Sequence, residues 1–307
     1  MAKSRRTRRF RRFWISLPAR SQRPARIDGT PPTLTRPAKD AEKARRIDRG
    51  RRMKRNLMVI GIGAGNPEYV TVQAVKALNK VSVFFIPNKG QDKADLHHLR
   101  REICDRYIEG SNYRLVDFDI PERAKDGVYA TDVAAWRAEV RAIYERLIVE
   151  ELGAGEIGGF LIWGDPSLYD GTMGILDAIT AAGQVELEYE VIPGISSVSA
   201  LAARHKVALN RIGKSFTVMS GRQLSQGMPD DGGNVVVMLD SRDAFRDLDG
   251  DLEIYWGGYV GTEDELLVSG KLRDVAEDVA RTRKDARARK GWLMDTYLLS
   301  RPSDDGE

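Results

Sequence analysis

The chain has 307 residues, enough for two ordinary α/β domains, and 42% of them are hydrophobic, so each domain can have a buried core. No apolar run approaches the length of about eighteen residues that a membrane span requires, and the single cysteine, Cys104, excludes an internal disulfide. Three histidines without an HExxH or CxxC spacing provide no recognisable metal site. We therefore expect a metal-free protein of the reducing cytoplasm.

Charge is distributed unevenly along the chain. Residues 1–52 carry 18 Lys and Arg against 4 Asp and Glu, whereas residues 53–307 carry 31 against 41. The first segment is rich in Arg and Pro and has no sustained helical or strand period, so we expect a disordered extension. This segment has three interpretations: an arm for nucleic acid or a membrane surface, a transit peptide, or an extension outside the functional protein. The third rests on Met53, which can serve as an ordinary start residue a few positions before the first strand.

From Arg55 onwards, strand and helix patterns alternate, which predicts an α/β fold. A buried strand at 56–63 ends in glycines, a helix follows at 69–80, and a second strand at 81–87 stops at Pro87. After a long polar segment the patterns predict a helix at 130–152, a strand from residue 157, a helix at 174–183 and a strand at 185–194.

The second half of the chain also alternates strand and helix patterns, with helices of a different composition. A helix of small residues is expected at 196–207, strands at 216–221, 234–240 and 252–261, a charged amphipathic helix at 272–290, and a last strand at 292–299. We place the junction between two α/β domains at 192–194. The N-terminal domain then covers 53–192, the C-terminal domain covers 193–302, and an acidic tail occupies 303–307.

The stretch VIGIGAGNPEYVT at 59–71 resembles a dinucleotide-binding loop at first sight. Asn66 stands where the third glycine of that motif is required, and no acidic residue follows the second strand before Asp92, which disfavours a dinucleotide site. Gly61, Gly63 and Gly65 still permit a close approach of main chain to a ligand. The alternative is a tight turn that serves packing only.

Two later stretches also follow predicted strands. In WGDPSLYDG, Asp165 precedes a proline and is held extended, so its carboxylate can face a crevice at the sheet edge, or it can form a turn with Ser167 as helix cap. In EVIPGISSVSALAARH, Ser196 or Ser197 can cap a helix, and the free N–H groups of that helix can also bind a ligand.

In this order and spacing, the three stretches resemble the tetrapyrrole methylase family, from Asn56 to about Leu299. The resemblance implies two α/β domains, a cleft between them that binds S-adenosylmethionine, and a homodimer. The segments at 95–108, 190–213 and 254–265 are most similar to members that methylate C-1 of precorrin-5 and release acetate in cobalamin biosynthesis. Precorrin-5 is therefore the implied methyl acceptor.

The resemblance also implies the residues of the donor site. In many relatives a proline follows the second glycine of the first loop, where this chain has Ala64, and Leu239 stands where methionine is common. The implied contacts are Gly61, Gly63, Ala64, Trp163, Gly164, Asp165, Leu168, Ser196, Ser197, Leu239 and Val260.

Methyl transfer from a sulfonium is an in-line displacement, so the protein must mainly orient the acceptor and exclude water. Removal of an acetyl group needs a water, a general base and donors to an oxyanion. His205 is the first candidate base, followed by Tyr169 and Asp165, although His205 can equally be an ordinary helix-end histidine. For the substrate carboxylates we expect arginines, which can also belong to a solvated helix face: Arg204, Arg211 and Arg222.

Two other functions stay open. One is another tetrapyrrole methyltransferase of the same family, and the other is a ribosomal RNA ribose methyltransferase of the same fold. The excess of acidic residues in 53–307 disfavours RNA, which requires a basic face. We therefore expect neither nucleic acid nor a membrane as partner.

Overall fold

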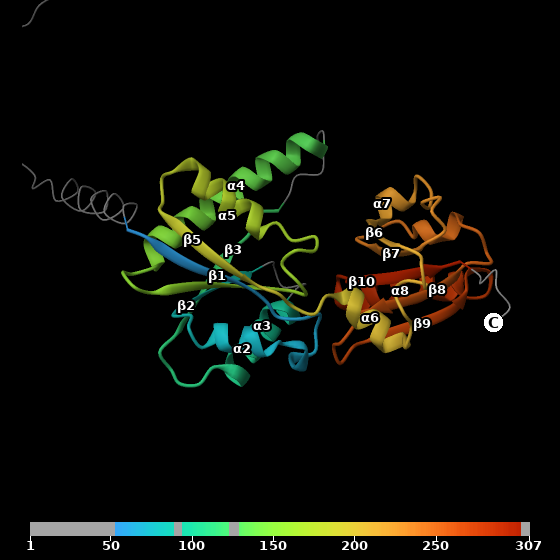
Figure 1. The fold of residues 1–307 in the computed structure, drawn as a ribbon, viewed down its shortest axis with the longest axis horizontal. Coiled ribbons are helices and arrows are strands. Elements are labelled where there is room, and N and C mark those ends of the chain that lie inside the picture. The colour runs from blue at the N-terminus through green and yellow to red at the C-terminus, as the bar shows by residue number, and fades with distance from the viewer. Residues whose placement is uncertain (1–52, 89–93, 123–128, 302–307) are drawn as a thin grey trace, which may run out of the picture. The chain divides into compact units, whose positions relative to one another are not determined.

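The computed structural model describes residues 53–88, 94–122 and 129–301. The expected basic extension at 1–52 and the acidic tail at 303–307 lie outside the described residues. The described residues form two β-sheets with helices packed on their faces, which confirms the α/β fold expected from the sequence (Figure 1).

The first sheet contains five parallel strands in the order β3-β2-β4-β1-β5. The strands are β1 (Arg55–Gly61), β2 (Val83–Asn88), β3 (Arg114–Asp119), β4 (Ile157–Ile162) and β5 (Leu187–Ile192). Because successive residues of a strand point to opposite faces, Val59 and Ile60 belong to different hydrophobic cores.

Helices cover both faces of the first sheet, as buried parallel strands require. They are α2 (Val72–Leu78), α3 (Ala94–Tyr107), α4 (Tyr129–Glu151) and α5 (Thr172–Ala182), with a short 3-10 helix, η1 (Pro67–Tyr69). The core that contains Val59 is closed by α4 and α5, and the core that contains Ile60 is closed by α2 and α3 (Figure 1).

The second sheet has the order β6-β7-β10-β8-β9 and is mostly antiparallel, with one parallel pair, β6 and β7. Its strands are β6 (Phe216–Ser220), β7 (Asn234–Met238), β8 (Glu253–Gly258), β9 (Leu266–Lys271) and β10 (Asp295–Ser300). The helices are α6 (Ser197–His205), α7 (Gly221–Leu224) and α8 (Leu272–Lys290), with the 3-10 helix η3 (Ala244–Asp247). Leu201 of α6 packs with Val236 on one face, and Val279 of α8 packs with Val237 on the other.

Two strands of the structure, β3 and β9, were not expected from the sequence. The long polar segment after β2 contains α3 and β3, and β9 follows β8. Both unexpected strands lie at a sheet edge, where the side chains are half exposed and the apolar signal is weak. Helix α3 is rich in charge, yet Leu99 and Ile103 are buried in the core of the first sheet.

Strand order brings the three motif segments together. In the first sheet β1 lies between β4 and β5, and all three run in the same direction, so the loops after them emerge at one edge. This edge, at the carboxyl ends of parallel strands, is where open α/β sheets bind their ligands. The last of these strands ends at Ile192, and the second sheet begins at Phe216.

Candidate active site

The loops after β1, β4 and β5 contact one another main chain to main chain. Gly63 and Gly164 form an isolated bridge with N–H to O distances of 3.2 and 2.7 Å. A Cβ atom at Gly61 would lie 2.6 Å from the nitrogen of Gly194, and one at Gly63 would lie 2.6 Å from the Cβ of Tyr69. The close approach that Gly61 and Gly63 permit is therefore an approach to protein, and neither residue lines the pocket described below.

Asp165 joins two of these loops. Its Oδ1 accepts from the main-chain N–H of Ser167 at 2.8 Å and from the Ser167 hydroxyl, and its Oδ2 accepts from the N–H of Gly194 at 2.8 Å. Burial raises the pKa of Asp165, but the bonds from the Ser167 hydroxyl, the Gly194 N–H and the Ser167 N–H outweigh burial, and the pKa lies below its usual value. The carboxylate is thus ionised, and both of its oxygens accept hydrogen bonds. Ser167 does not cap a helix, since α5 begins at Thr172.

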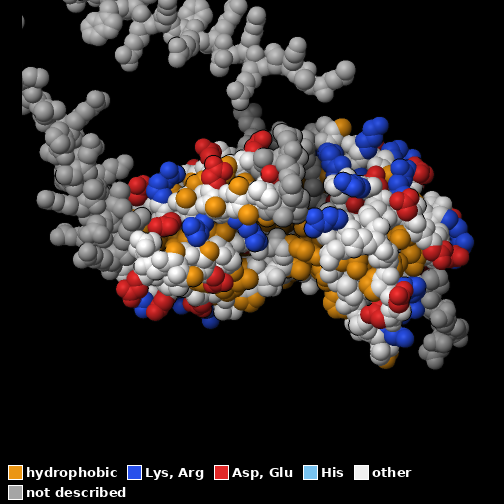
Figure 2. Space-filling view, turned by 90° about the horizontal axis from the view of Figure 1, so that it is seen from above, with side chains coloured by type: hydrophobic (Ala, Val, Ile, Leu, Met, Phe, Trp, Pro, Cys, Tyr) orange, Lys and Arg blue, Asp and Glu red, His pale blue; other side chains and the backbone are white. Residues whose placement is uncertain are grey.

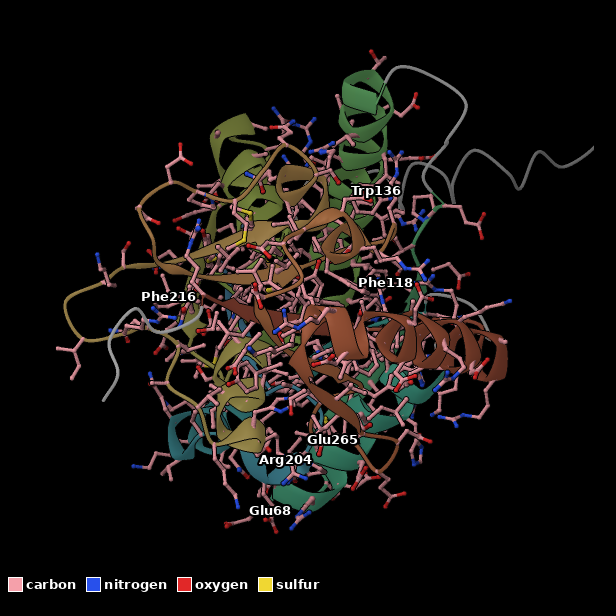
Figure 3. The ribbon with its side chains drawn as sticks, turned by 90° about the vertical axis from the view of Figure 1, so that its right-hand side faces the viewer. Glu68, Phe118, Trp136, Arg204, Phe216 and Glu265 are labelled. Carbon is pink, nitrogen blue, oxygen red and sulfur yellow. The ribbon has the colours of Figure 1, made fainter. Side chains whose placement is uncertain are left out.

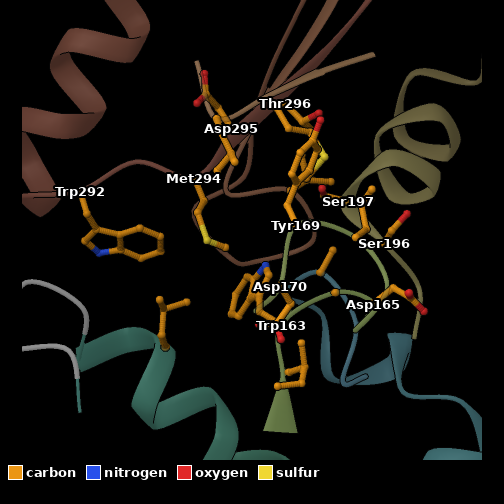
Figure 4. Close-up of a pocket in the computed structure, with 18 of the residues that line it drawn as sticks. Trp163, Asp165, Tyr169, Asp170, Ser196, Ser197, Trp292, Met294, Asp295 and Thr296 are labelled. Carbon is orange, nitrogen blue, oxygen red and sulfur yellow. The ribbon is translucent and has the colours of Figure 1, made fainter. Parts of the chain in front are cut away.

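A pocket of about 560 Å³ opens beside these loops, and both sheets contribute to its wall (Figure 4). This volume is within the range of about 300–1,000 Å³ that small-molecule sites occupy. The first sheet and its helices contribute residues of β2, α3, α4 and β4 and of the loops after β1 and β4, and the start of α6 adds Ser196 and Ser197. The second sheet contributes the segments 238–241 after β7, 257–260 at the end of β8, and 292–296 before β10.

Strained backbone is concentrated at this pocket. Five described residues other than glycine have a positive φ, and three of them line the pocket: Tyr169 at 53°, Leu239 at 55° and Tyr259 at 48°. Side chains avoid this region unless the surroundings hold them there, and such strain clusters at functional sites. Leu239 is 65% exposed and Tyr169 is 47% exposed, so both side chains are available to a ligand.

Most residues expected at the donor site line this pocket. They are Ala64, Trp163, Gly164, Asp165, Leu168, Ser196, Ser197, Leu239 and Val260. Ser196 is also the N-cap of α6, since its hydroxyl accepts from the N–H of Ser199 at 3.4 Å. Ser196 therefore both caps α6 and lines the pocket.

Four other expected residues lie outside the pocket lining. His205 ends α6, and its Nε2 lies 3.0 Å from the main-chain oxygen of Trp256. Arg204 forms an ion pair of 2.6 Å with Glu265, which in turn accepts from the N–H of Gly261 (Figure 3). Arg204 thus supports a loop of the second sheet. The remaining two are Arg211, in the segment between α6 and β6, and Arg222, exposed on α7.

Comparison with known proteins assigns the family. Residues 56–276 match the sequence model of the Tetrapyrrole (Corrin/Porphyrin) Methylases. The chain belongs to the tetrapyrrole methylase family. It is therefore a methyltransferase, and S-adenosylmethionine is the methyl donor of this family.

Individual relatives of this tetrapyrrole methylase match most of the chain. A precorrin-6A synthase [deacetylating] from a Sinorhizobium species is 46% identical over 252 residues, which are 81% of this chain and 97% of that protein. The crystal structure described as a cobalamin synthesis related protein (CobF) from Corynebacterium diphtheriae is 32% identical, with a TM-score of 0.70, covering 82% and 100% of the two chains. A uroporphyrin-III-C-methyltransferase from Thermus thermophilus, at 18% identity and a TM-score of 0.52 over 80% and 94%, shares the fold.

The pocket of this tetrapyrrole methylase contains two arginines that the sequence analysis missed. Arg100 of α3 and Arg287 of α8 both line it. A signal for Arg100 exists in the sequence, because it lies one turn after Leu96 on the helix face that also carries Ile103. A charged residue at a core-facing helical position is unusual and indicates a specific partner.

A second buried arginine supports the pocket wall from beneath. Arg283 of α8 is 1% exposed and lies 2.8 Å from a carboxylate oxygen of Asp295. It also pairs with Asp243 and donates to the main-chain oxygen of Asp240, the residue after Leu239. This cluster holds the segment after β7 in place.

Metal and covalent chemistry receive no support from the described residues. Within 53–88, 94–122 and 129–301, no group of three His, Cys, Asp or Glu could hold a metal ion. Burial raises the pKa of Cys104 to about 12, so its thiol stays protonated. In the same residues, no helix is long and apolar enough to cross a membrane.

Proposed function

We propose that this chain methylates C-1 of precorrin-5 and releases acetate, to give precorrin-6A in cobalamin biosynthesis. The observation that carries the proposal is the 46% identity to the precorrin-6A synthase of Sinorhizobium over 97% of that protein. The pocket lies at the carboxyl edge of the first sheet, where the motif loops of the family converge.

The pocket wall suits a methyl donor such as S-adenosylmethionine. A Cβ atom at Gly164 would meet only the Cα of Ser196, at 3.8 Å, so bare main chain faces the pocket at this point. The first turn of α6, at Ser197, adds main-chain donors that suit the donor's carboxylate. Leu239 offers an exposed apolar surface to the donor's adenine. When bound, the donor supplies an electrophilic methyl group.

The tasks of the protein are then orientation and exclusion of water. Asp165 is a positioning residue, because its carboxylate is occupied by Ser167 and Gly194 and keeps two loops of the wall in register. Gly61 and Gly63 act in the same way, by allowing these loops to touch.

Tyr169 is our candidate for the acetyl-removing step. Its side chain lines the pocket, and burial raises the pKa of its hydroxyl, which stays protonated at neutral pH (Figure 4). A protonated phenol can donate to the oxygen of the acetyl carbonyl as water attacks the carbonyl carbon and gives its proton to solvent. The bond between that carbon and the macrocycle then breaks, its electron pair stays on the macrocycle, and the acetyl group leaves as acetate. His205 is less suited to the role of base, since its ring contacts the main chain of Trp256 outside the pocket.

The experiment is mass spectrometry of the products that the full chain makes from S-adenosylmethionine and precorrin-5. We expect methylated, deacetylated product with one acetate released per methyl transferred. Methylation without acetate would favour another tetrapyrrole methyltransferase. Methyl uptake by structured RNA, with none by the tetrapyrrole, would contradict the proposal.

Partners and location complete the proposal. We expect a homodimer in the cytoplasm, with domains at 53–192 and 193–302 that each carry one sheet, and without a bound metal. Neither RNA nor a membrane is an expected partner, in keeping with the acidic excess of residues 53–307. On the face seen in Figure 2, basic and acidic side chains are interspersed.

A further inference from the structure

Arg100 occupies an opening between two strands of the first sheet. The pairing of β2 with β4 ends at Phe85 and Phe160, and the next main-chain oxygen of β4, that of Leu161, accepts from Nε of Arg100 at 3.0 Å. The Nη1 atom donates to the main-chain oxygen of Leu96 at 2.8 Å. The guanidinium is thus fixed in place by two carbonyl oxygens.

Arg100 forms no direct ion pair among the described residues, and the Asp170 carboxylate on the same pocket wall acts on its charge only from a greater distance. Its third nitrogen, Nη2, has no hydrogen-bond partner among the described residues. Burial lowers the pKa of Arg100 to about 10, while Tyr144 and Asp170 raise it. The side chain therefore stays protonated at neutral pH. A buried cation without a paired anion is costly, so a structural role alone does not account for this residue.

The wall around Arg100 is apolar and aromatic. Phe85, Tyr144 and Phe160 line the same part of the pocket, and the rings of Tyr144 and Phe160 are stacked with centroids 4.6 Å apart. An arginine set in such a wall suits an anion carried by a large apolar ligand, because the low local dielectric strengthens the ion pair.

A second cation stands elsewhere on the pocket lining. Arg287 lies in the last turn of α8, is exposed, and forms none of the ion pairs found among the described residues. Its main-chain oxygen caps the helix by accepting from Gly291 at 2.8 Å, so its position is defined while its guanidinium is available.

We infer that Arg100 binds a carboxylate of the tetrapyrrole substrate within the pocket, and that Arg287 binds a second one. This inference rests on the proposed function. Arg100 provides a fixed, dehydrated anchor that sets the register of the macrocycle. Arg287 provides a mobile contact that attracts the acid and is screened by salt.

The first test measures steady-state constants of full-length variants, with each substrate varied in turn. Arg100→Gln keeps a donor for Leu161 but removes the charge, and we expect the KM for precorrin-5 to rise by about 10- to 100-fold. The KM for S-adenosylmethionine should stay at the wild-type value. Arg100→Lys, which keeps the charge and loses the planar fork, should fall between Arg100→Gln and the wild type.

Arg101→Gln is the matched control, because Arg101 is the next residue of α3 and pairs with Asp117 at the surface. Equal tetrapyrrole KM values for Arg100→Gln and Arg101→Gln, with wild-type enzyme active, would overturn the inference and leave the proposed function intact. A parallel rise of both KM values in Arg100→Gln would also overturn it, since that indicates a structural role. A wild-type chain that methylates no tetrapyrrole would instead refute the proposed function.

Arg287→Gln gives an independent test, since an exposed helix-end residue can be replaced without loss of folding. We expect a smaller rise of the tetrapyrrole KM than in Arg100→Gln, and one that diminishes as ionic strength increases. An unchanged KM at low ionic strength would remove Arg287 from the site.

Discussion

The Oδ2 atom of Asp165 accepts a hydrogen bond from the main-chain N–H of Gly194 at 2.8 Å, and this bond links the loop after β4 to the loop after β5. The two strands are not neighbours, because β1 lies between them. Gly61, at the end of β1, is enclosed by the same contact, since Gly194 and Pro166 lie within 2.9 Å of the position of its absent Cβ. One carboxylate thus links the ends of two strands, and the end of β1 packs closely between them.

Asp165→Asn should loosen this junction. The amide of Asn cannot accept at both Gly194 and Ser167, so one main-chain N–H, half-buried at Gly194 or exposed at Ser167, loses its partner, at a cost of about 1 kcal/mol. We expect a lower free energy of unfolding in urea and a higher KM for the methyl donor. Ser167→Ala, which removes one donor and leaves the link to Gly194, should cost less.

The effect of Asp165 should depend on pH. Its pKa is lower in the folded chain than in the unfolded chain, so the stabilisation is complete above the unfolded pKa and is lost as the pH falls through the folded one. The stability difference between wild type and Asp165→Asn should therefore shrink in acid. A difference that grows in acid would contradict this account.

Leu239→Gly should separate stability from function. The φ of 55° costs a leucine about 1–3 kcal/mol, whereas glycine adopts it freely, so the substitution relieves strain in the folded state. Glycine also raises the entropy of the unfolded chain, which lowers stability and offsets part of that gain. We expect a melting temperature equal to or above that of Leu239→Ala, which retains the strain. Both variants lose the exposed side chain, and both should show the same increase in the KM for the methyl donor.

Arg283→Met should be strongly destabilising. The change leaves the carboxylates of Asp240, Asp243 and Asp295 without their shared cation, and removal of one partner from a buried ion pair costs about 3–5 kcal/mol. Burial already raises the pKa of Asp295 although the charge of Arg283 lowers it, so loss of that charge should raise the pKa further. Protonation then favours the folded state, so the variant should regain stability as the pH falls.

Arg281→Gln is the control for Arg283→Met. Arg281 lies on the same helix, is exposed and pairs with Asp278 at the surface. Such pairs contribute about 0–1 kcal/mol, so the unfolding curve should hardly move. Equal losses of stability in the two variants would show that the buried cluster around Arg283 contributes no more to the free energy of unfolding than a surface ion pair does.

Tyr169→Phe should uncouple the two chemical events. Removal of one donor to an oxyanion lowers kcat by about 100- to 1,000-fold in other enzymes, and we expect a loss of this order in acetate release. Donor binding should persist, since the ring remains. Tyr189→Phe is the control, because the hydroxyl of Tyr189 on β5 donates to Asp177 of α5 and neither residue lines the pocket. Unchanged acetate release in Tyr169→Phe would exclude the phenol from the reaction.

His205→Gln should leave the chemistry in place. The side chain contacts the main-chain oxygen of Trp256 and the ring of Tyr255, outside the pocket lining, and glutamine can still donate to that oxygen. We expect wild-type ratios of acetate to methyl transferred, measured by mass spectrometry, with a small loss of stability of about 1 kcal/mol. A selective loss of acetate release would restore His205 as a candidate base.

Central strands and their loops are predictable from this sequence because the signals are local. Strands β1, β4 and β7 are short runs of buried apolar residues, and the turns after β1 and β4 are marked by glycine and proline. Edge strands β3 and β9 are not predicted, because their sequences, RLVDFD and LLVSGK, neither form a continuous apolar run nor alternate cleanly between apolar and polar residues. Their position depends on the partner strand, which a local pattern does not contain.

Only the part of the site that faces the methyl donor was predictable from the sequence. Donor-side residues such as Gly164 and Ser197 follow directly after strands, where topology places a ligand. The substrate-binding arginines were not predictable. Arg204 and Arg100 both lie on helices with similar neighbours in the sequence, and they differ only in the group of the folded protein that each one contacts. Glu265 meets Arg204, whereas the Leu161 carbonyl, left free by the end of the β2–β4 pairing, meets Arg100.

The contact between Gly61 and Gly194 sets a limit on how this enzyme can be redesigned. A Cβ atom at 194 would lie 2.1 Å from the oxygen of Gly164, so even alanine at this position would push three loops apart. The segments after β7 and β8, in contrast, are held by side chains such as Arg283 and Glu265. A library for new methyl acceptors should therefore vary the wall from the second sheet and leave the glycine junction untouched.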